Sequence, residues 1–300
     1  MSAMEAAWSD FWRAGGRGAG SGCVPSGLHG IDAVQRAVWA DAVRPLRKNA
    51  SVLDLATGDG AVLVKMRAAR PDLKLTGVDS AVALPGAPSG TQLKAGVRME
   101  RLPFPAGRFD LVSSQFGIEY GDVGATATEV ARVLRPGGAF AFLVHHAGGP
   151  IVAHNRARSA ALAWVVRESG LLERARGFVR LRSGGRLPVP QGFSEAVAEG
   201  GTRFPEQSVA AEFAEAVRRT LVMSSGESPA RTLSVLDELA AKAANELARV
   251  ASLMGAARSA DGIASITTAF RAVGLAISEP TTASEGTGRL PFGWVLRGRR

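Results

Sequence analysis

The stretch SVLDLATGDG (residues 51–60) decides the fold of this 300-residue chain. Residues 51–56 form a short apolar run that ends in glycines, as a buried strand of a parallel sheet does. Residues 61–70 have the pattern of a helix, which Pro71 ends. Glycines allow a backbone to approach a ligand closely, and the first N–H groups of a helix lack partners. The segment therefore predicts a nucleotide-binding turn between a strand and a helix.

An acidic residue follows at the spacing that such a site needs. Residues 73–80 (LKLTGVDS) predict a second strand, and Asp79 closes it about 20 residues after the glycine-rich turn. A carboxylate there can accept hydrogen bonds from both hydroxyls of a ribose. The dinucleotide pattern Gly-x-Gly-x-x-Gly is not matched, because Leu63 stands where the third glycine would follow Gly58 and Gly60.

Asp54, near the end of the first strand, narrows the choice of nucleotide. Ligands of open α/β sheets bind at the carboxyl ends of the strands, where this residue lies. A carboxylate there would repel a pyrophosphate and would attract the ammonium group of a methionine moiety. The residues therefore favour S-adenosylmethionine (SAM) over a dinucleotide.

Strands and helices continue to alternate after this segment. Residues 108–116 and 139–147 predict strands, and residues 126–134 predict a helix between them. Alternation at this spacing predicts βαβ units and a parallel sheet, which is an α/β fold.

The pattern changes over residues 151–258, which have helical periodicity alone. The α/β pattern then returns, with a helix over 261–274 and strands over 275–283 and 291–299. We therefore divide the chain into an N-terminal helix and lid (1–30), a nucleotide-binding core (31–150), a helical insertion or cap (151–258), and a last helix and strand pair that complete the core (259–300).

Composition and charge exclude several classes of protein. The chain is 46% hydrophobic and 21% charged, as globular proteins are, with no apolar run that could span a bilayer and no secretory signal at its start. Cys23 is the only cysteine, so no disulfide forms within the chain. These features fit a cytoplasmic protein. The net charge of +9 would attract nucleic acid, but no aromatic-rich RNA-binding motif accompanies it, and we interpret it as a solvated basic surface.

Four segments together resemble one family. VLDLATGDG, GVDSA, RLPFPAGRFDLVSSQFGIEYGD and EVARVLRPGGAFAFLV resemble, in order and spacing, the class I SAM-dependent methyltransferases, above all the ubiquinone/menaquinone-biosynthesis type and its small-molecule relatives. The resemblance covers about residues 50–147, and the end of the chain resembles the family's last helix and strand pair. It implies a Rossmann-like, mainly parallel seven-stranded sheet with a helical insertion, and SAM as the methyl donor.

The resemblance also implies roles for residues at matching positions. The donor-binding positions correspond to Asp54, Ala56, Gly58, Gly60, Asp79, Ser80, Met99, Glu100 and Gln115. Asp79 and Ser80 would bind the ribose, and Met99 and Glu100 would border the adenine. Ala56 departs from the glycine that is usual in the family. The family also often has an aspartate near Arg98, and Glu100 or a backbone carbonyl would replace it.

Histidines and aromatic residues are the candidates for the acceptor side. Methyl transfer to oxygen or nitrogen can require a base, and histidine is the usual one. His145 and His146 end the strand over 139–147 and are candidate catalytic residues, with a structural hydrogen bond as the alternative. No metal is expected, because His154 lacks cysteine partners or suitably spaced carboxylates.

The candidate substrate contacts come from two segments. They are Phe116, Glu119 and Tyr120, after the strand over 108–116, and Trp8 and Trp12, on a helix predicted over residues 1–14. That helix would be a lid, with Gly15 to Gly22 as its hinge, or its aromatic face would pack on the core.

The sequence thus predicts a SAM-dependent methyltransferase that acts on a small organic acceptor, at oxygen or nitrogen, and releases S-adenosylhomocysteine (SAH). Residues 151–258 would supply an apolar acceptor pocket or contact a second copy in a homodimer. Two alternatives stay open. The acceptor is RNA or protein, or the chain binds SAM without catalysis, as a regulator or partner subunit.

Overall fold

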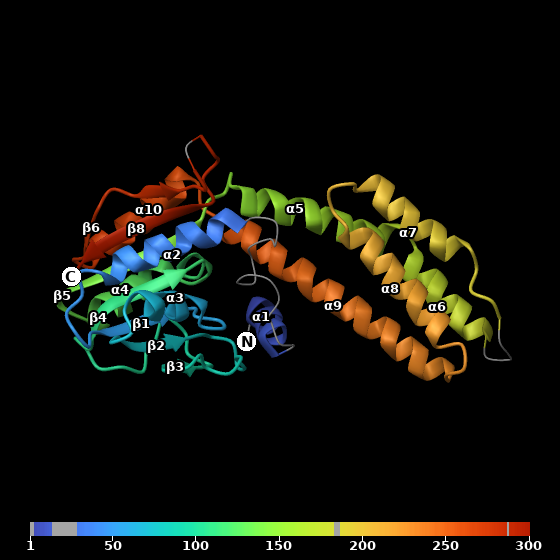
Figure 1. Ribbon diagram of the computed structural model, residues 1–300, viewed down its shortest axis with the longest axis horizontal. Helices are drawn as coiled ribbons and strands as arrows, with labels where there is room; N and C mark the ends of the chain where they lie inside the picture. The colour runs from blue at the N-terminus through green and yellow to red at the C-terminus, as the bar shows by residue number, and fades with distance from the viewer. Residues whose placement is uncertain (1–2, 14–28, 183–186, 287) are drawn as a thin grey trace. The chain divides into compact units, whose positions relative to one another are not determined.

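The computed structural model describes residues 3–13, 29–182, 187–286 and 288–300. The chain divides into two compact units, one formed by Met1–Ala153 with Ser252–Arg300 and one formed by His154–Ala251. The first unit contains the sheet, and the described part of the second is helical (Figure 1). The hinge predicted at Gly15–Gly22 lies outside the described residues.

The sheet of the first unit has the order β3-β2-β1-β4-β5-β8-β6, with β7 also paired to β8. Its strands are β1 (Ser51–Leu55), β2 (Lys74–Val78), β3 (Thr91–Lys94), β4 (Phe109–Gln115), β5 (Leu134–His145), β6 (Ala276–Ile277), β7 (Thr281–Ala283) and β8 (Gly293–Arg299). β1 to β5 pair in parallel, and β8 runs antiparallel to β5, β6 and β7. The predicted Rossmann-like, mainly parallel α/β fold is confirmed.

The described sheet has eight strands where seven were expected. Residues 275–283, predicted as one strand, form β6 and β7, because Pro280 interrupts them and has no N–H group to donate to the neighbouring strand. β3 (Thr91–Lys94) was not located in the sequence. It is short and lies at the edge of the sheet, so its residues lack the apolar run that marks a buried strand.

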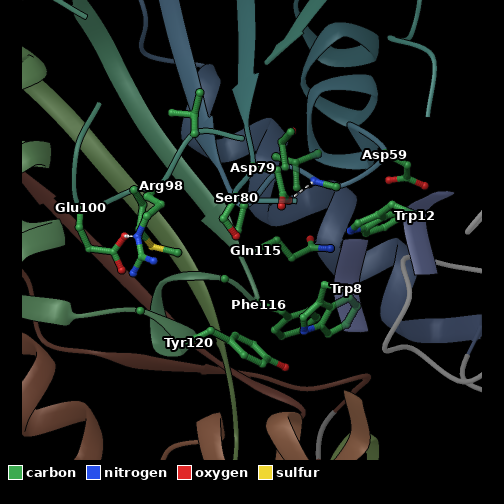
Figure 2. Close-up of a pocket in the computed structure, with 18 of the residues that line it drawn as sticks. Trp8, Trp12, Asp59, Asp79, Ser80, Arg98, Glu100, Gln115, Phe116 and Tyr120 are labelled. Atoms are coloured by element: carbon green, nitrogen blue, oxygen red, sulfur yellow. Dashed lines mark hydrogen bonds and ion pairs between the residues drawn. The ribbon is translucent and has the colours of Figure 1, made fainter. Parts of the chain in front are cut away.

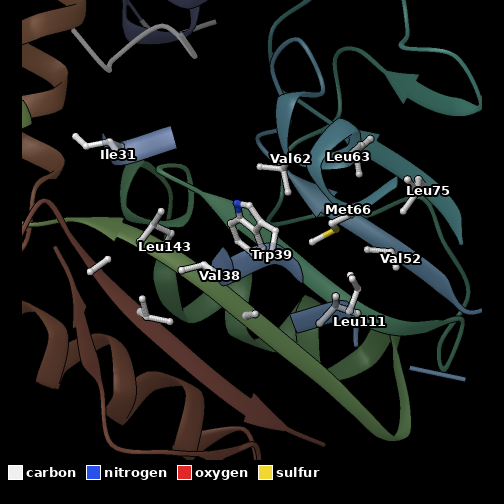
Figure 3. Close-up of a cluster of buried hydrophobic side chains, with 14 of the residues drawn as sticks. Ile31, Val38, Trp39, Val52, Val62, Leu63, Met66, Leu75, Leu111 and Leu143 are labelled. Carbon is white, nitrogen blue, oxygen red and sulfur yellow. The ribbon is translucent and has the colours of Figure 1, made fainter. Parts of the chain in front are cut away.

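Helices cover both faces of the sheet. α2 (His29–Val43) and α3 (Ala61–Ala69) pack on one face, while α4 (Val123–Val133) and α10 (Ala260–Ala272) pack on the other. Alternate residues of β1 serve the two layers, since side chains of a strand point to opposite faces: Val52 contacts the α2–α3 layer and Leu53 the α4–α10 layer. Figure 3 shows the first layer, with Trp39 at its centre.

The second unit has a hydrophobic core of its own. Its helices are the later part of α5 (Pro150–Ala163), the π-helix η2 (Trp164–Glu168), α6 (Leu171–Leu181), α7 (Gly192–Arg203), α8 (Val209–Met223) and most of α9 (Pro229–Ala256). None of the described helices is both long and apolar enough to cross a membrane. The expectation that this part of the chain supplies the acceptor pocket stays a prediction.

The topology collects the candidate residues at one edge of the sheet. Asp54 lies near the carboxyl end of β1, Asp79 directly follows β2, and Gln115 ends β4. His145 ends β5, which is parallel to them. Because carboxyl ends of parallel strands meet at the same edge, a ligand site is expected there.

Candidate functional site

A cavity of about 240 Å³ lies at this edge of the sheet. It is lined by Trp8, Trp12, Ala56, Thr57, Gly58, Asp59, Ala61, Val62, Asp79, Ser80, Val97, Arg98, Met99, Glu100, Gln115, Phe116, Gly117, Tyr120, Gly121 and Asp122. Figure 2 shows Arg98 and Glu100 at one end of this group and Trp8 and Trp12 at the other.

Asp79 ties the glycine-rich turn to the end of β2. Its Oδ2 accepts a hydrogen bond from the backbone N–H of Gly58 (2.9 Å), and its Oδ1 accepts one from Ala81 (2.9 Å). Burial raises the pKa of Asp79, and these two N–H groups oppose the rise. Each carboxylate oxygen has a second lone pair, so Asp79 can still accept from a ligand's hydroxyl groups. A polar ligand bound by Asp79 would thus be coupled to the glycine-rich turn, because the same carboxylate also binds Gly58.

Asp54 lies behind the turn and does not line the cavity. It is 1% exposed, and its Oδ1 accepts a hydrogen bond from the hydroxyl of Ser113, the residue beside it on β4 (2.7 Å). Its Oδ2 has no partner of ordinary geometry among the described residues. Burial raises the pKa of Asp54 to about 7, and the charges of Asp79 and Asp59 add to that rise. A cation bound nearby would therefore stabilise its ionised form.

Two residues of the cavity wall have a strained backbone. Ala56 has φ +52° and Phe116 has φ +55°, in the left-handed region that non-glycine residues rarely adopt. Ala56 packs against Gly117, where an added Cβ would lie 2.5 Å from the Cβ of Ala56. Strain of this kind persists where the surroundings fix the backbone, and it is common at functional sites.

The end of the cavity near Glu100 is held by loop contacts. Oε1 of Glu100 accepts from the backbone N–H of Asp122 (3.1 Å), and its Oε2 lies 3.4 Å from Nε of Arg98. The following loop is fixed by α4, because Glu129 accepts from the N–H of Leu102 (2.6 Å). These contacts hold in place the loop that is predicted to border adenine.

Aromatic side chains form the other end of the cavity. Trp8 contacts the ring of Tyr120 edge to face, with ring centroids 6.2 Å apart, and stacks on Trp12 at 6.4 Å. Gln115 lies between this end and the turn, and its Oε1 accepts from the indole of Trp39 (2.8 Å). Its amide NH2 group is therefore the part left to donate to a ligand.

The cavity thus joins most of the predicted site residues. It has in its lining Ala56, Gly58, Asp79, Ser80, Met99, Glu100, Gln115, Phe116, Tyr120, Trp8 and Trp12, and it lacks Asp54, Gly60, Glu119, His145 and His146. Gly60 instead caps α3 with φ +79°. His145 is fully buried behind Phe116, and His146 stacks on Trp294 (centroids 4.8 Å apart). A catalytic role for either histidine stays a prediction.

Several residues near the cavity were not singled out in the sequence. Asp122 was detectable, because an aspartate just before a helix is a common N-terminal cap, and its Oδ1 does accept from Ala125 (2.9 Å). Trp39 had no local signal. Within the described ranges, no group of three or more His, Cys, Asp or Glu residues could hold a metal ion.

The residues that line the cavity fit SAM. Four acids (Asp59, Asp79, Glu100 and Asp122) and one cation, Arg98, line the cavity among the described residues. This excess of negative charge suits a donor that is a sulfonium and carries an ammonium group. Gly58, with φ +54°, also gives the turn a left-handed backbone that glycine adopts without strain.

Comparisons with known proteins give one family match and several similar structures. Residues 53–142 match the sequence model of the family described as "Methyltransferase domain". The chain is similar to a SAM-dependent methyltransferase from Mesorhizobium loti (15% identity over 90% of this chain and 100% of that chain, TM-score 0.45). It is also similar to a chain from the complex of the Haloferax volcanii Trm112 methyltransferase activator with a methyltransferase (15% identity, 97% and 96% covered, TM-score 0.44). No curated protein matches the chain in sequence.

The match identifies residues 53–142 as a methyltransferase domain, and the lining of the cavity fits SAM as its cofactor. The family resemblance seen in the sequence is thereby confirmed.

Proposed function

We propose that this methyltransferase transfers the methyl group of SAM to a small organic acceptor, at oxygen or nitrogen, and releases SAH. The observation that carries the proposal is a single cavity with two chemically distinct ends. Arg98 and Glu100 lie at one end, and four aromatic rings (Trp8, Trp12, Phe116 and Tyr120) lie toward the other. The glycine-rich turn borders the aromatic end, where Trp12 packs on Gly58.

The polar end is suited to bind the donor. Asp79 would accept from the ribose hydroxyls, with Ser80 beside it, and Met99 and Glu100 would border the adenine. Gln115, whose oxygen is occupied by Trp39, would donate its NH2 group to the carboxylate of the methionine part. Asp54 would act through its charge from behind the turn, and Gly60 would shape the turn.

The aromatic end is suited to bind an acceptor with a flat or apolar body, because aromatic rings pack well against such surfaces. When bound, SAM supplies an electrophilic methyl group on its sulfonium sulfur. The residues of the chain then have to align the acceptor with that group and exclude water. Trp8 and Trp12, from the N-terminal helix α1 (Ala3–Arg13), would close this end.

The donor site is tested by calorimetry with SAM. Asp79→Asn keeps the size of the side chain and removes its charge, so we expect SAM affinity to fall about 10- to 100-fold. The control is Asp237→Asn, a 65% exposed aspartate of α9 that pairs with Arg176. Unchanged affinity in Asp79→Asn would refute the assignment of the ribose site.

The acceptor class is tested with methyl-labelled SAM and fractionated cell extract. We expect label in the small-molecule fraction and none in RNA or protein. Label in RNA or protein would show that the acceptor is a macromolecule and not a small molecule. SAM binding without transfer to any fraction would instead favour a regulator or partner subunit.

A further inference from the structure

A buried pair, Glu119 and His145, lies directly behind the aromatic end of the cavity. Glu119 belongs to the 3-10 helix η1 (Ile118–Tyr120), His145 ends β5, and neither side chain is exposed. Oε1 of Glu119 accepts from the backbone N–H of His145 (2.9 Å) and lies 2.9 Å from Nδ1 of its ring. Oε1 accepts from the backbone N–H and is therefore an acceptor, so its contact with the ring is a hydrogen bond when Nδ1 carries the hydrogen. One oxygen atom therefore fixes both the backbone and the ring of His145.

The ring of His145 supports two residues of the cavity wall. It stacks on Phe116, with ring centroids 4.0 Å apart and planes 20° apart. It also contacts Tyr120 edge to face, at 6.2 Å. Phe116 has the strained φ of +55°, which persists only if its neighbours hold it. His145 is the flat surface behind it.

Arg258 clamps the two segments that carry the pair. Its Nη2 donates to the backbone carbonyl of Glu119 (2.7 Å), and its backbone N–H donates to the carbonyl of His145 (2.9 Å). The end of β5 and η1 are therefore held together independently of the two side chains. A change in the pair should move the rings without opening this part of the fold.

We propose that Glu119 and His145 are positioning residues, which touch neither donor nor acceptor and fix where Phe116 and Tyr120 present their rings to the acceptor. That the molecule beside these rings is a methyl acceptor rests on the proposed function. The position of the rings can be tested without it. It gives the buried histidine a role other than that of a base.

The first test follows the only tyrosine of the chain, Tyr120. Incorporation of 3-fluorotyrosine gives one ¹⁹F resonance, which reports the cavity wall directly. In the SAH-loaded protein, Glu119→Ala should shift and broaden this resonance while SAH affinity stays within about three-fold of wild type. Glu119→Gln should restore the wild-type resonance, because one amide oxygen can make both contacts that Oε1 makes.

The control for this test is His154→Asn, a histidine in the helical unit. It should leave the resonance unchanged. An unchanged resonance in Glu119→Ala, or a change that occurs only together with loss of SAH binding, would overturn the proposal. His145→Leu gives a second route to the same result if Glu119→Ala does not fold.

The second test separates positioning from catalysis. Its acceptor is the small-molecule fraction that takes up label in the extract experiment, used before methylation. For His145→Leu we expect acceptor KM to rise about 10-fold, with kcat less affected and the shape of the pH–rate profile unchanged. Loss of a general base would instead lower kcat about 10²- to 10⁴-fold and remove a limb of that profile, and this would overturn the proposal. Unchanged kinetics in His145→Leu, together with a lower stability, would also overturn the proposal.

The two tests fail separately. If no fraction accepts label, the proposed function fails, whereas the ¹⁹F resonance still decides whether the pair positions the wall.

Discussion

The indole ring of Trp12 lies directly on Gly58. A Cβ atom on Gly58 would stand 2.8 Å from Cη2 of the ring and closer still to Cζ2, below the 3.0 Å that real Cβ atoms keep from their neighbours. The contact joins α1, at the start of the chain, to the turn that begins the nucleotide site. Gly58 is therefore needed for close approach as well as for its φ of +54°.

We predict that Gly58→Ala weakens SAM binding more in the wild-type background than in Trp12→Ala. In the wild type the new methyl group displaces the indole or the turn. In Trp12→Ala only the strain of a left-handed alanine remains, about 1–2 kcal/mol. Calorimetry on the two single variants and the double variant measures the coupling, expected at about 0.5–3 kcal/mol. Equal losses in both backgrounds would show that the contact has no effect on donor binding.

Ala56→Gly should stabilise the protein. Its φ of +52° strains alanine and suits glycine, and the relief exceeds the gain in unfolded-chain entropy, leaving a net increase of up to about 1 kcal/mol in the free energy of unfolding. Urea denaturation measures it. The matched control is Ala68→Gly, at an exposed position of α3, which should lower that free energy by about 0.5–1 kcal/mol. A loss at both positions would contradict the strain argument.

The elements that place the cavity were predictable because each is a local pattern. Apolar runs marked β1, β2, β4 and β5, and their polar ends marked Asp79 and Gln115. The parallel topology then brings those ends together without further information. This is why the donor half of the site could be assembled from the sequence.

Contacts between distant residues could not be predicted in the same way. Trp39 donates to Gln115 across 76 residues, and Arg258 donates to the backbone of Glu119 across 139. The positive φ of Phe116 has no signal in the sequence, since the residue itself is not a glycine. The burial of His145 likewise depends on contacts with Glu119 and Phe116 from another segment. The position of a histidine at a strand end predicts a candidate base, but it does not predict that the ring is buried behind Phe116.

Turnover of a small acceptor should depend little on salt. The described lining of the cavity has four acids and one arginine, so the net charge of +9 is carried elsewhere on the chain. Between 50 and 200 mM salt we expect acceptor KM to change less than about three-fold. A nucleic-acid acceptor held by six to ten phosphate contacts would instead lose about 10³- to 10⁵-fold in affinity. Initial rates at both salt concentrations, with the small-molecule fraction that takes up label as acceptor, distinguish a small acceptor from a nucleic acid.

Asp54 should make the free energy of unfolding depend on pH. Burial raises its pKa to about 7, against about 3.9 in an unfolded chain. Between those values the folded chain keeps a proton that the unfolded chain releases, so stability falls as pH rises from about 4 to about 7. A pKa difference of about 3 corresponds to about 4 kcal/mol, which sets the order of the effect.

Asp54→Asn removes this ionisation and can still accept the hydrogen bond from Ser113. We therefore expect the variant to match the wild type near pH 4 and to become the more stable protein as pH rises to 8. Urea denaturation at pH 5, 6.5 and 8 measures the difference. Some decrease with pH should remain in the variant, because burial raises the pKa of Asp79 as well. Asp237→Asn, at an exposed site, should follow the wild type at each pH. Parallel pH dependences in wild type and Asp54→Asn would mean that the buried carboxylate is ionised throughout this range.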